Sequence, residues 1–253
     1  MLKQQSPFHS FRAYGVAFGG EITRPFLEVM ESKAATAIPT VGGYSTANAG
    51  PFNVRDVVRF ESASTQVFGV TGNTAWDTVI TSRVVGLNIM NQVTADEIVA
   101  HLVMTQPFHK AGAEPVPARF NTIGSRFVNL RIGGVPCEPK LEHEGPCGKA
   151  VWTGNDRPVY DLYETPKICD KGEEKMPRTP VKGSLTTLVS ELGASPCFEA
   201  EGNAVYVPDF GVVYLAEYYV KDNERQLNMF RFQLGCGSGG NGGGPGGGAG
   251  GST

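Results

Sequence analysis

The chain has 253 residues, including 33 glycines and 17 prolines, and carries a formal net charge of −3. Charged residues make up only 19% of it, a balance typical of many short strands joined by turns rather than of long helices. No run of Lys or Arg exceeds two residues, which argues against nucleic acid as a partner. No apolar run approaches the ~20 residues that span a bilayer, so we expect no membrane span.

The N-terminal sequence MLKQQSPFHS lacks the apolar core of a signal peptide. Met1 favours a cytoplasmic protein, whereas the composition favours the mature form of an extracellular or cell-surface protein, and both readings remain open. We expect residues 1–10 to form a polar N-terminal arm on the surface or on a neighbouring subunit.

Strand patterns dominate the first third of the chain. Phe11–Ile22 alternates weakly, and Val54–Val70 and Trp76–Met90 flank a Thr-Gly-Asn turn. Turn dipeptides within Pro25–Gly50 argue against a long helix there. One face of the Trp76–Met90 strand is expected to carry Val79, Val85, Leu87 and Ile89.

The segment Val93–Gln106 fits two kinds of element. Thr94 followed by Glu97 is a capping-box signature, and the apolar residues after it have helical spacing. Read with a period of two, the same segment gives the alternating faces of a strand. The residues alone leave helix and strand equally open.

The middle of the chain is less regular. Arg119–Ile132 alternates as a strand does, and Gly133-Gly134 after it predicts a hairpin turn. Residues 135–180 are rich in proline and cysteine and predict a long irregular insertion. Ser184–Gly193 predicts one short helix, with Ser184 as its cap and Gly193 as its stop.

Two strand-like runs, Val205–Val220 and Arg225–Leu234, are crowded with aromatic and β-branched residues and flank the polar sequence KDNE. They predict a β-hairpin. Residues 236–253 are then mostly glycine and predict a tail. As a free linker such a tail is a flexible coil. Because ordering glycine costs much backbone entropy, an ordered tail needs a partner, and we expect it to dock on another copy of the protein.

Together these patterns predict an all-β protein. We expect an antiparallel, jelly-roll-like β-sandwich over residues 11–235, with one short helix, the insertion at 135–180 and the glycine-rich tail at 236–253.

Two phrases, SRVVGLNIMNQVTADEIVAHLVM at residues 82–104 and SRFVNLRIGG at residues 125–134, resemble an idiom of secreted bacterial all-β proteins of the "choice-of-anchor" type. The resemblance implies an extracytoplasmic β-sandwich or β-solenoid and a strand over Val93–Gln106. It carries no catalytic residues. The chain departs from the idiom in having no visible signal peptide and a glycine-rich segment where an anchor is expected.

Five cysteines form no CxxC pair. In an oxidising compartment they allow two disulfides, with Cys236 as the expected odd thiol. A zinc site is the alternative, because thiolates and imidazole are zinc ligands, but the spacing matches no standard finger. The candidates for these two roles are Cys137, His143, Cys147, Cys169 and Cys197.

No nucleophile elbow or phosphate-binding loop occurs, so we expect neither catalytic residues nor a cofactor. His101 lies in an apolar run and is expected to be structural. Carboxylate pairs such as Asp96-Glu97 and Glu199-Glu201 could flank a glycosidic bond, although acidic residues in loops are usually solvated.

Aromatic residues concentrate in the C-terminal hairpin. If exposed they would form a platform for stacking sugars, and if buried they belong to the core, which is the commoner case. The candidates are Tyr206, Tyr214, Tyr218 and Phe230.

The sequence therefore favours a structural subunit of an extracellular or surface assembly, a homo-oligomer or polymer that associates through strand edges and terminal segments. The alternative is a carbohydrate-binding or adhesive module with a polysaccharide partner. A glycoside-active enzyme is the third reading.

Overall fold

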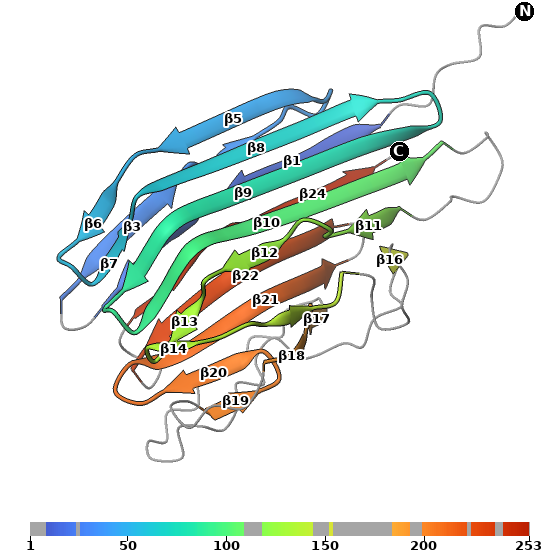
Figure 1. The fold of residues 1–253 in the computed structure, drawn as a ribbon. Helices are drawn as coiled ribbons and strands as arrows, with labels where there is room; N and C mark the ends of the chain where they lie inside the picture. Colours follow the sequence, from blue (N-terminus) through green and yellow to red (C-terminus); the bar gives the residue numbers. More distant parts are fainter. Residues whose placement is uncertain are drawn as a thin grey trace, which may run out of the picture.

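A computed structural model describes residues 9–23, 26–108, 118–143, 152–153, 184–192, 199–221, 224–235 and 240–252. Throughout these residues the chain forms strands and turns and no helix. The strands form two large antiparallel sheets that pack face to face around one hydrophobic core (Figure 1). The prediction of an all-β antiparallel sandwich is confirmed.

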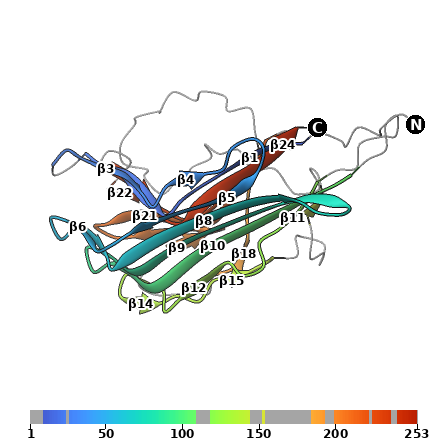
Figure 2. The ribbon, with the colours of Figure 1, turned by 90° about the horizontal axis from the view of Figure 1, so that it is seen from above.

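The first large sheet, sheet A, unites the two ends of the described chain. Its strands are β1 (Ser10–Val16), β2 (Phe18–Ile22), β3 (Glu28–Lys33), β4 (Thr36–Ala37), β17 (Ser184–Thr187), β19 (Glu199–Glu201), β20 (Ala204–Val207), β21 (Gly211–Lys221), β22 (Glu224–Leu234), β23 (Gly240–Gly243) and β24 (Gly246–Ser252). Seen from above, β1 and β24 lie side by side in one layer, and β8, β9 and β10 form the other (Figure 2).

The second large sheet, sheet B, comes from the first two thirds of the chain. Its strands are β5 (Gly43–Ala49), β6 (Phe52–Val54), β7 (Val58–Phe60), β8 (Ser62–Thr71), β9 (Ala75–Ile89), β10 (Val93–Pro107), β11 (Arg119–Asn121), β12 (Arg126–Val128), β13 (Arg131–Ile132), β14 (Val135–Pro136) and β16 (Trp152–Thr153). A separate small pair joins β15 (Lys140–Leu141) to β18 (Val189–Glu191).

The glycine-rich segment lies inside sheet A. β24 pairs with β1 on one side, from Ser10↔Ser252 to Val16↔Gly246, and with β22 on the other. β23 lies in the same way between β2 and β22. Residues 240–252 therefore fold back on their own subunit, and the expected tail that docks on another copy is not what the structure shows for them.

Close packing explains why this strand is built from glycine. A Cβ on Gly247 would lie 2.5 Å from Ile80 Cγ2 of sheet B, and one on Gly242 would lie 2.6 Å from the Phe232 ring. Opposite β24, a Cβ on Gly15 of β1 would lie 2.5 Å from Thr65 Cγ2. The backbones of the two sheets approach where side chains are missing, and aromatic rings from neighbouring strands cover the glycines. Pairing of the β24 backbone with β1 and β22 orders this strand, because its glycines have no side chains that could do so.

The hairpin of β9 and β10 forms the centre of sheet B. Segment 93–107 is a strand, as the resemblance implied, and pairs with β9 from Val93↔Ile89 to Pro107↔Ala75. The prediction of which residues form the apolar face of β9 is wrong in part. Ile80 and Val84 are buried, Val79 is not, and the buried positions change parity at Gly86, which has φ +67°. An irregularity at Gly86 thus moves Leu87 to the buried face.

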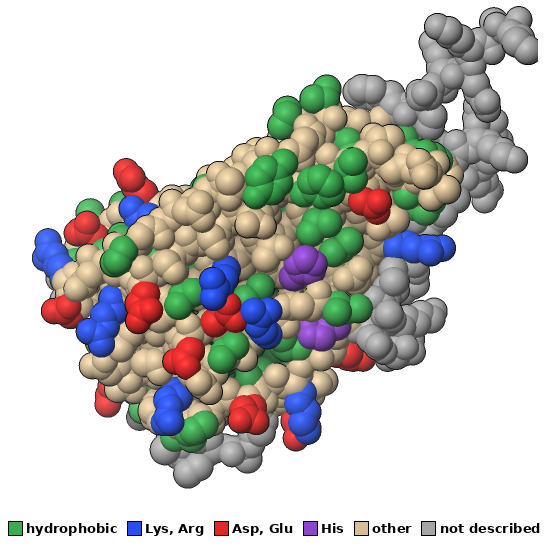
Figure 3. All heavy atoms as spheres, turned by 45° about the horizontal axis from the view of Figure 1, so that its top comes forward, with side chains coloured by type: hydrophobic (Ala, Val, Ile, Leu, Met, Phe, Trp, Pro, Cys, Tyr) green, Lys and Arg blue, Asp and Glu red, His purple; other side chains and the backbone are tan. Residues whose placement is uncertain are grey.

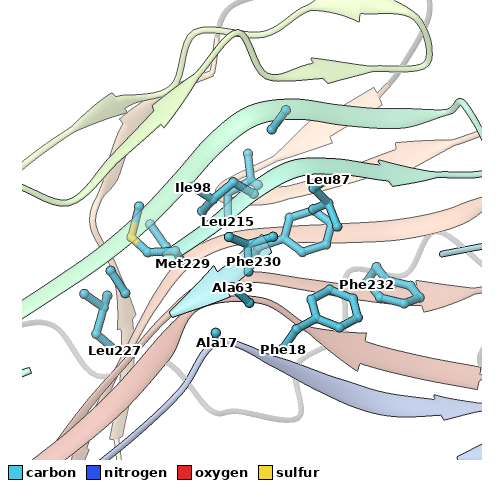
Figure 4. Close-up of a cluster of buried hydrophobic side chains, with 14 of the residues drawn as sticks. Ala17, Phe18, Ala63, Leu87, Ile98, Leu215, Leu227, Met229, Phe230 and Phe232 are labelled. Atoms are coloured by element: carbon cyan, nitrogen blue, oxygen red, sulfur yellow. The ribbon is translucent and has the colours of Figure 1, made fainter. Parts of the chain in front are cut away.

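The core between the sheets is rich in phenylalanine. Figure 4 shows Phe18, Phe230 and Phe232 of sheet A beside Leu87 and Ile98 of sheet B, and all five are at most 2% exposed. Burial of each such side chain contributes about 1.5–3 kcal/mol relative to exposure. This contact between sheets is the main source of stability that the structure shows.

The predicted helix at Ser184–Gly193 is wrong. Residues 184–187 form β17, which pairs with β21, and residues 189–191 form β18. Leu188 is fully buried between them, and its N–H donates to the carbonyl of Ala216. A helix of about ten residues is marginal without tertiary support, and pairing with a buried strand stabilises the extended form instead.

Two hairpin predictions and two strand predictions can be compared with the structure. β13 and β14 pair across Gly133-Gly134, as expected. β21 and β22 form the predicted C-terminal hairpin, with Lys221 opposite Glu224. The expected single strands over Val205–Val220 and Arg119–Ile132 are each broken by turns, because Asp209 and Asn129 adopt positive φ. The predicted insertion at 135–180 lies mostly outside the described residues.

Candidate functional site

The four aromatic candidates for sugar stacking belong to sheet A. Tyr218 and Phe230 face the core and are at most 1% exposed, and Tyr214 is 6% exposed. Tyr206 is partly buried and packs against Tyr214 in a second, smaller cluster. The hairpin therefore offers no exposed aromatic platform among these four residues, in line with the core reading.

Tyr214 supports an ion pair instead. The Arg231 guanidinium lies 3.6 Å from the centroid of the Tyr214 ring and donates to both carboxylate oxygens of Glu217, at 2.8 and 2.6 Å. Burial of Arg231 disfavours its charged form. The hydrogen bonds and the charge of Glu217 outweigh this effect and raise the pKa of Arg231. The three side chains form a satisfied structural unit on sheet A.

Two of the five candidates for disulfides or zinc lie in the described part of the chain. Cys137 is a buried free thiol, and burial raises its pKa to about 11, which keeps it protonated at neutral pH. His143 Nδ1 lies 3.2 Å from Thr122 Oγ1. Cys147, Cys169 and Cys197 lie outside the described residues. Within the described ranges, no group of three or more metal-ligating side chains gathers.

The carboxylate pair Asp96-Glu97 has structural partners. Glu97 bridges Arg83 and Arg126 on the outer face of sheet B. Burial of Glu97 opposes its ionisation, but the two arginines outweigh this and lower its pKa. Asp96 accepts a hydrogen bond from Asn129. A carboxylate held ionised in this way does not suit the proton-donating role that glycoside hydrolysis requires.

His101 is also tied into sheet B. Its Nδ1 lies 2.9 Å from Thr81 Oγ1 on the neighbouring strand, and its backbone N–H and C=O both bond to Ser125 Oγ. Burial lowers the pKa of His101, so its neutral form is favoured. Ser125 bonds the backbone of His101 and not its imidazole, so the pair is not an activated nucleophile.

Sequence analysis missed a partly exposed apolar row on the outer face of sheet B. Tyr44, Phe68, Val79 and Val103 lie directly opposite one another on β5, β8, β9 and β10. Tyr44 is 61% exposed and Phe68 is 40% exposed. Figure 3 shows hydrophobic side chains gathered on the upper half of this face, where Figure 1 places β5 and β8. Alternation along β8 could have predicted that Phe68 points outward. The row itself could not be predicted, because it depends on the register of all four strands.

The features above define a class of protein: an antiparallel β-sandwich with an apolar row on the outer face of one sheet. The chain belongs to the family described as "Domain of unknown function (DUF8256)", which matches it over residues 9–149. The match includes β1 to β15. No curated protein and no solved structure matches the chain. No described segment forms a helix with the length and apolar character needed to cross a membrane.

Proposed function

We propose that the protein is a structural subunit of an extracellular or cell-surface assembly, such as a filament, layer or appendage, that associates with copies of itself. The observation that carries the proposal is the pair of open sheet edges. Within the described residues β5 pairs only with β8, and β3 pairs only with β2. Unpaired backbone groups on an edge strand are a template for a strand from another chain. The extracellular setting follows from the resemblance to choice-of-anchor proteins.

Light scattering over a wide range of protein concentration tests this function, with electron microscopy of the concentrated sample. We expect a mass that rises with concentration and ordered oligomers or polymers in the images. A particle with the mass of one chain at every concentration would contradict the proposal.

Terminal segments are the second proposed route of association. The segment made by β23 and β24 pairs on both sides, so exchange between copies would replace its contacts with identical ones. Ala13 lies directly opposite Ala249. A disulfide between Cys substituted at both positions would hold the strand in its own subunit. Loss of assembly only in the oxidised double variant, and not in either single variant, supports exchange, and unchanged assembly contradicts it.

Carbohydrate binding is the second candidate function, and one observation favours it. Tyr44 and Phe68 are exposed neighbours on sheet B, and the next row carries the polar side chains of Thr46, Gln66 and Thr81. Aromatic rings beside hydrogen-bonding groups suit the flat face of a sugar. A glycan array tests this candidate: Tyr44→Ala should abolish binding, while Leu27→Ala, at an exposed position on the loop before β3, should not.

A further inference from the structure

β5 is an edge strand in the described part of sheet B, and its sequence lacks the residues that usually protect such a strand. Its sequence GYSTANA contains no charged residue and no proline, and no charged residue occurs between Lys33 and Arg55. Natural edge strands are commonly blunted by charges, prolines or bulges. The β3 edge of sheet A follows that rule, since β3 carries Glu28, Glu31 and Lys33. The β5 and β3 edges therefore differ in whether they discourage pairing.

Exposed apolar side chains gather beside this edge. Val41, Tyr44, Phe68 and Val70, which we call the edge patch, are 77%, 61%, 40% and 39% exposed. Val41 precedes β5, Tyr44 is on it, and Phe68 and Val70 are on β8. An apolar patch next to an unpaired backbone edge supplies both contacts that strand addition uses.

We propose that β5 pairs antiparallel with β5 of a second copy, about a two-fold axis through Thr46, so that the two B sheets form one continuous sheet. This proposal rests on the proposed function and names the surface that serves it. In this register Tyr44 lies opposite Asn48 of the second copy, and Ser45 lies opposite Ala47. No like charges meet, because the strand has none, and the strand is complementary to itself.

Because β5 is complementary to itself, a second copy of the protein is the partner that we expect at this edge. The symmetric register brings the outward side chains of Tyr44, Thr46 and Asn48 together on one face, and it brings the two edge patches towards the same side of the joint sheet. A seven-residue edge and a small patch bury less than the ~1,200 Å² of a standard stable interface. The dimer is therefore weak and depends on concentration.

A charge exchange at Thr46 tests the pairing, because the axis places this residue opposite its own copy. Thr46→Lys and Thr46→Glu are prepared separately and then mixed in equal amounts. Like charges directly opposite each other should weaken self-association of each variant by about tenfold or more. Opposite charges in the mixture should restore it. The matched control is Ile123→Lys, at a 53% exposed position in the turn between β11 and β12, which should associate like the wild type.

Sedimentation velocity over a concentration series gives the readout. Two monomeric variants whose mixture dimerises support the proposal, and unfolded protein cannot imitate this result because mixing would not rescue it. If the wild type associates and both variants associate as strongly, β5 is not the interface, although the assembly function stands. If the variants are monomeric but their mixture does not dimerise, this register is overturned. A wild type that is monomeric throughout overturns the proposed function as well.

Discussion

Ser82 Oγ donates a 2.9 Å hydrogen bond to the carbonyl oxygen of Gly246, which ties the inner face of sheet B to the glycine-rich strand of sheet A. Ser82 also accepts from Thr65 Oγ1 at 3.2 Å. Buried hydroxyl groups thus find partners at the place where the sheets are closest. The last strand of the chain is therefore a structural part of the sandwich and not an addition to it.

Gly247→Ala should lower the free energy of unfolding by about 1–3 kcal/mol, because overpacking a closely packed interior is destabilising. The added Cβ would meet Ile80 Cγ2 at 2.5 Å and the carbonyl oxygen of Tyr14 at 2.7 Å. Gly50→Ala is the control, since nothing lies within 4 Å of a Cβ there. Urea unfolding of both variants measures the difference, and equal stabilities would contradict the close approach of the sheets.

Deletion of residues 240–253 should abolish cooperative unfolding. All seven residues of β1 pair with β24, and β22 pairs with both β23 and β24, so the deletion divides sheet A. Deletion of residues 1–8 removes no described strand and is the control. Thermal unfolding followed by circular dichroism measures the effect. A truncated protein that melts like the intact chain would show that sheet A does not need this strand.

Stability should fall as the pH falls below the ordinary histidine range. Burial lowers the pKa of His9, and its ring stacks on Trp76 at 4.8 Å between centroids. Neither ring nitrogen has a hydrogen-bond partner in the described part of the chain. The unfolded state takes up the proton more readily, so the stability due to neutral His9 is present above the unfolded pKa and is lost as the pH decreases.

His9→Phe keeps an aromatic ring and removes the proton-binding group, so its unfolding free energy should depend less on pH than that of the wild type. Chemical denaturation at pH 7.5 and 5.5 measures this dependence. His101→Gln serves as a comparison, because burial lowers the pKa of His101 as well. Identical pH dependence in the wild type and His9→Phe would contradict the buried, neutral state of His9.

Arg231→Leu should lower the free energy of unfolding by about 2–3 kcal/mol, because it leaves the buried carboxylate of Glu217 without its cation. The Glu217 side chain is 7% exposed and that of Arg231 is 33% exposed. Lys140→Ala breaks the exposed pair with Glu191 and should cost less than about 1 kcal/mol. Equal losses in the two variants, measured by urea unfolding, would contradict a structural role for Glu217 and Arg231.

The sequence predicted the local features of this fold better than the long-range ones. Alternation and turn residues correctly placed the β21–β22 hairpin and the Gly133-Gly134 turn, because both depend on neighbouring residues. The strand at 184–187 could not be found this way, since its extended form depends on pairing with β21, some thirty residues later. The capping signature at Thr94 was likewise overridden by pairing in the centre of sheet B.

The apolar row on sheet B could not be predicted from the sequence for a similar reason. Aromatic density along the chain pointed to Tyr214 and Tyr218, which the sandwich buries, and not to Tyr44 and Phe68, which are isolated in sequence and adjacent across two strands. Glycine composition in turn suggested a tail that docks on another copy, because composition does not show that β1 and β22 leave a place for one strand between them.

Hydrogen–deuterium exchange of the C-terminal segment, followed by mass spectrometry in dilute solution, tests the central structural claim most directly. Paired on both sides within its own subunit, segment 240–252 should exchange as slowly as β22, and its protection should not depend on protein concentration. Complete exchange within seconds, or protection that appears only at high concentration, would contradict the account.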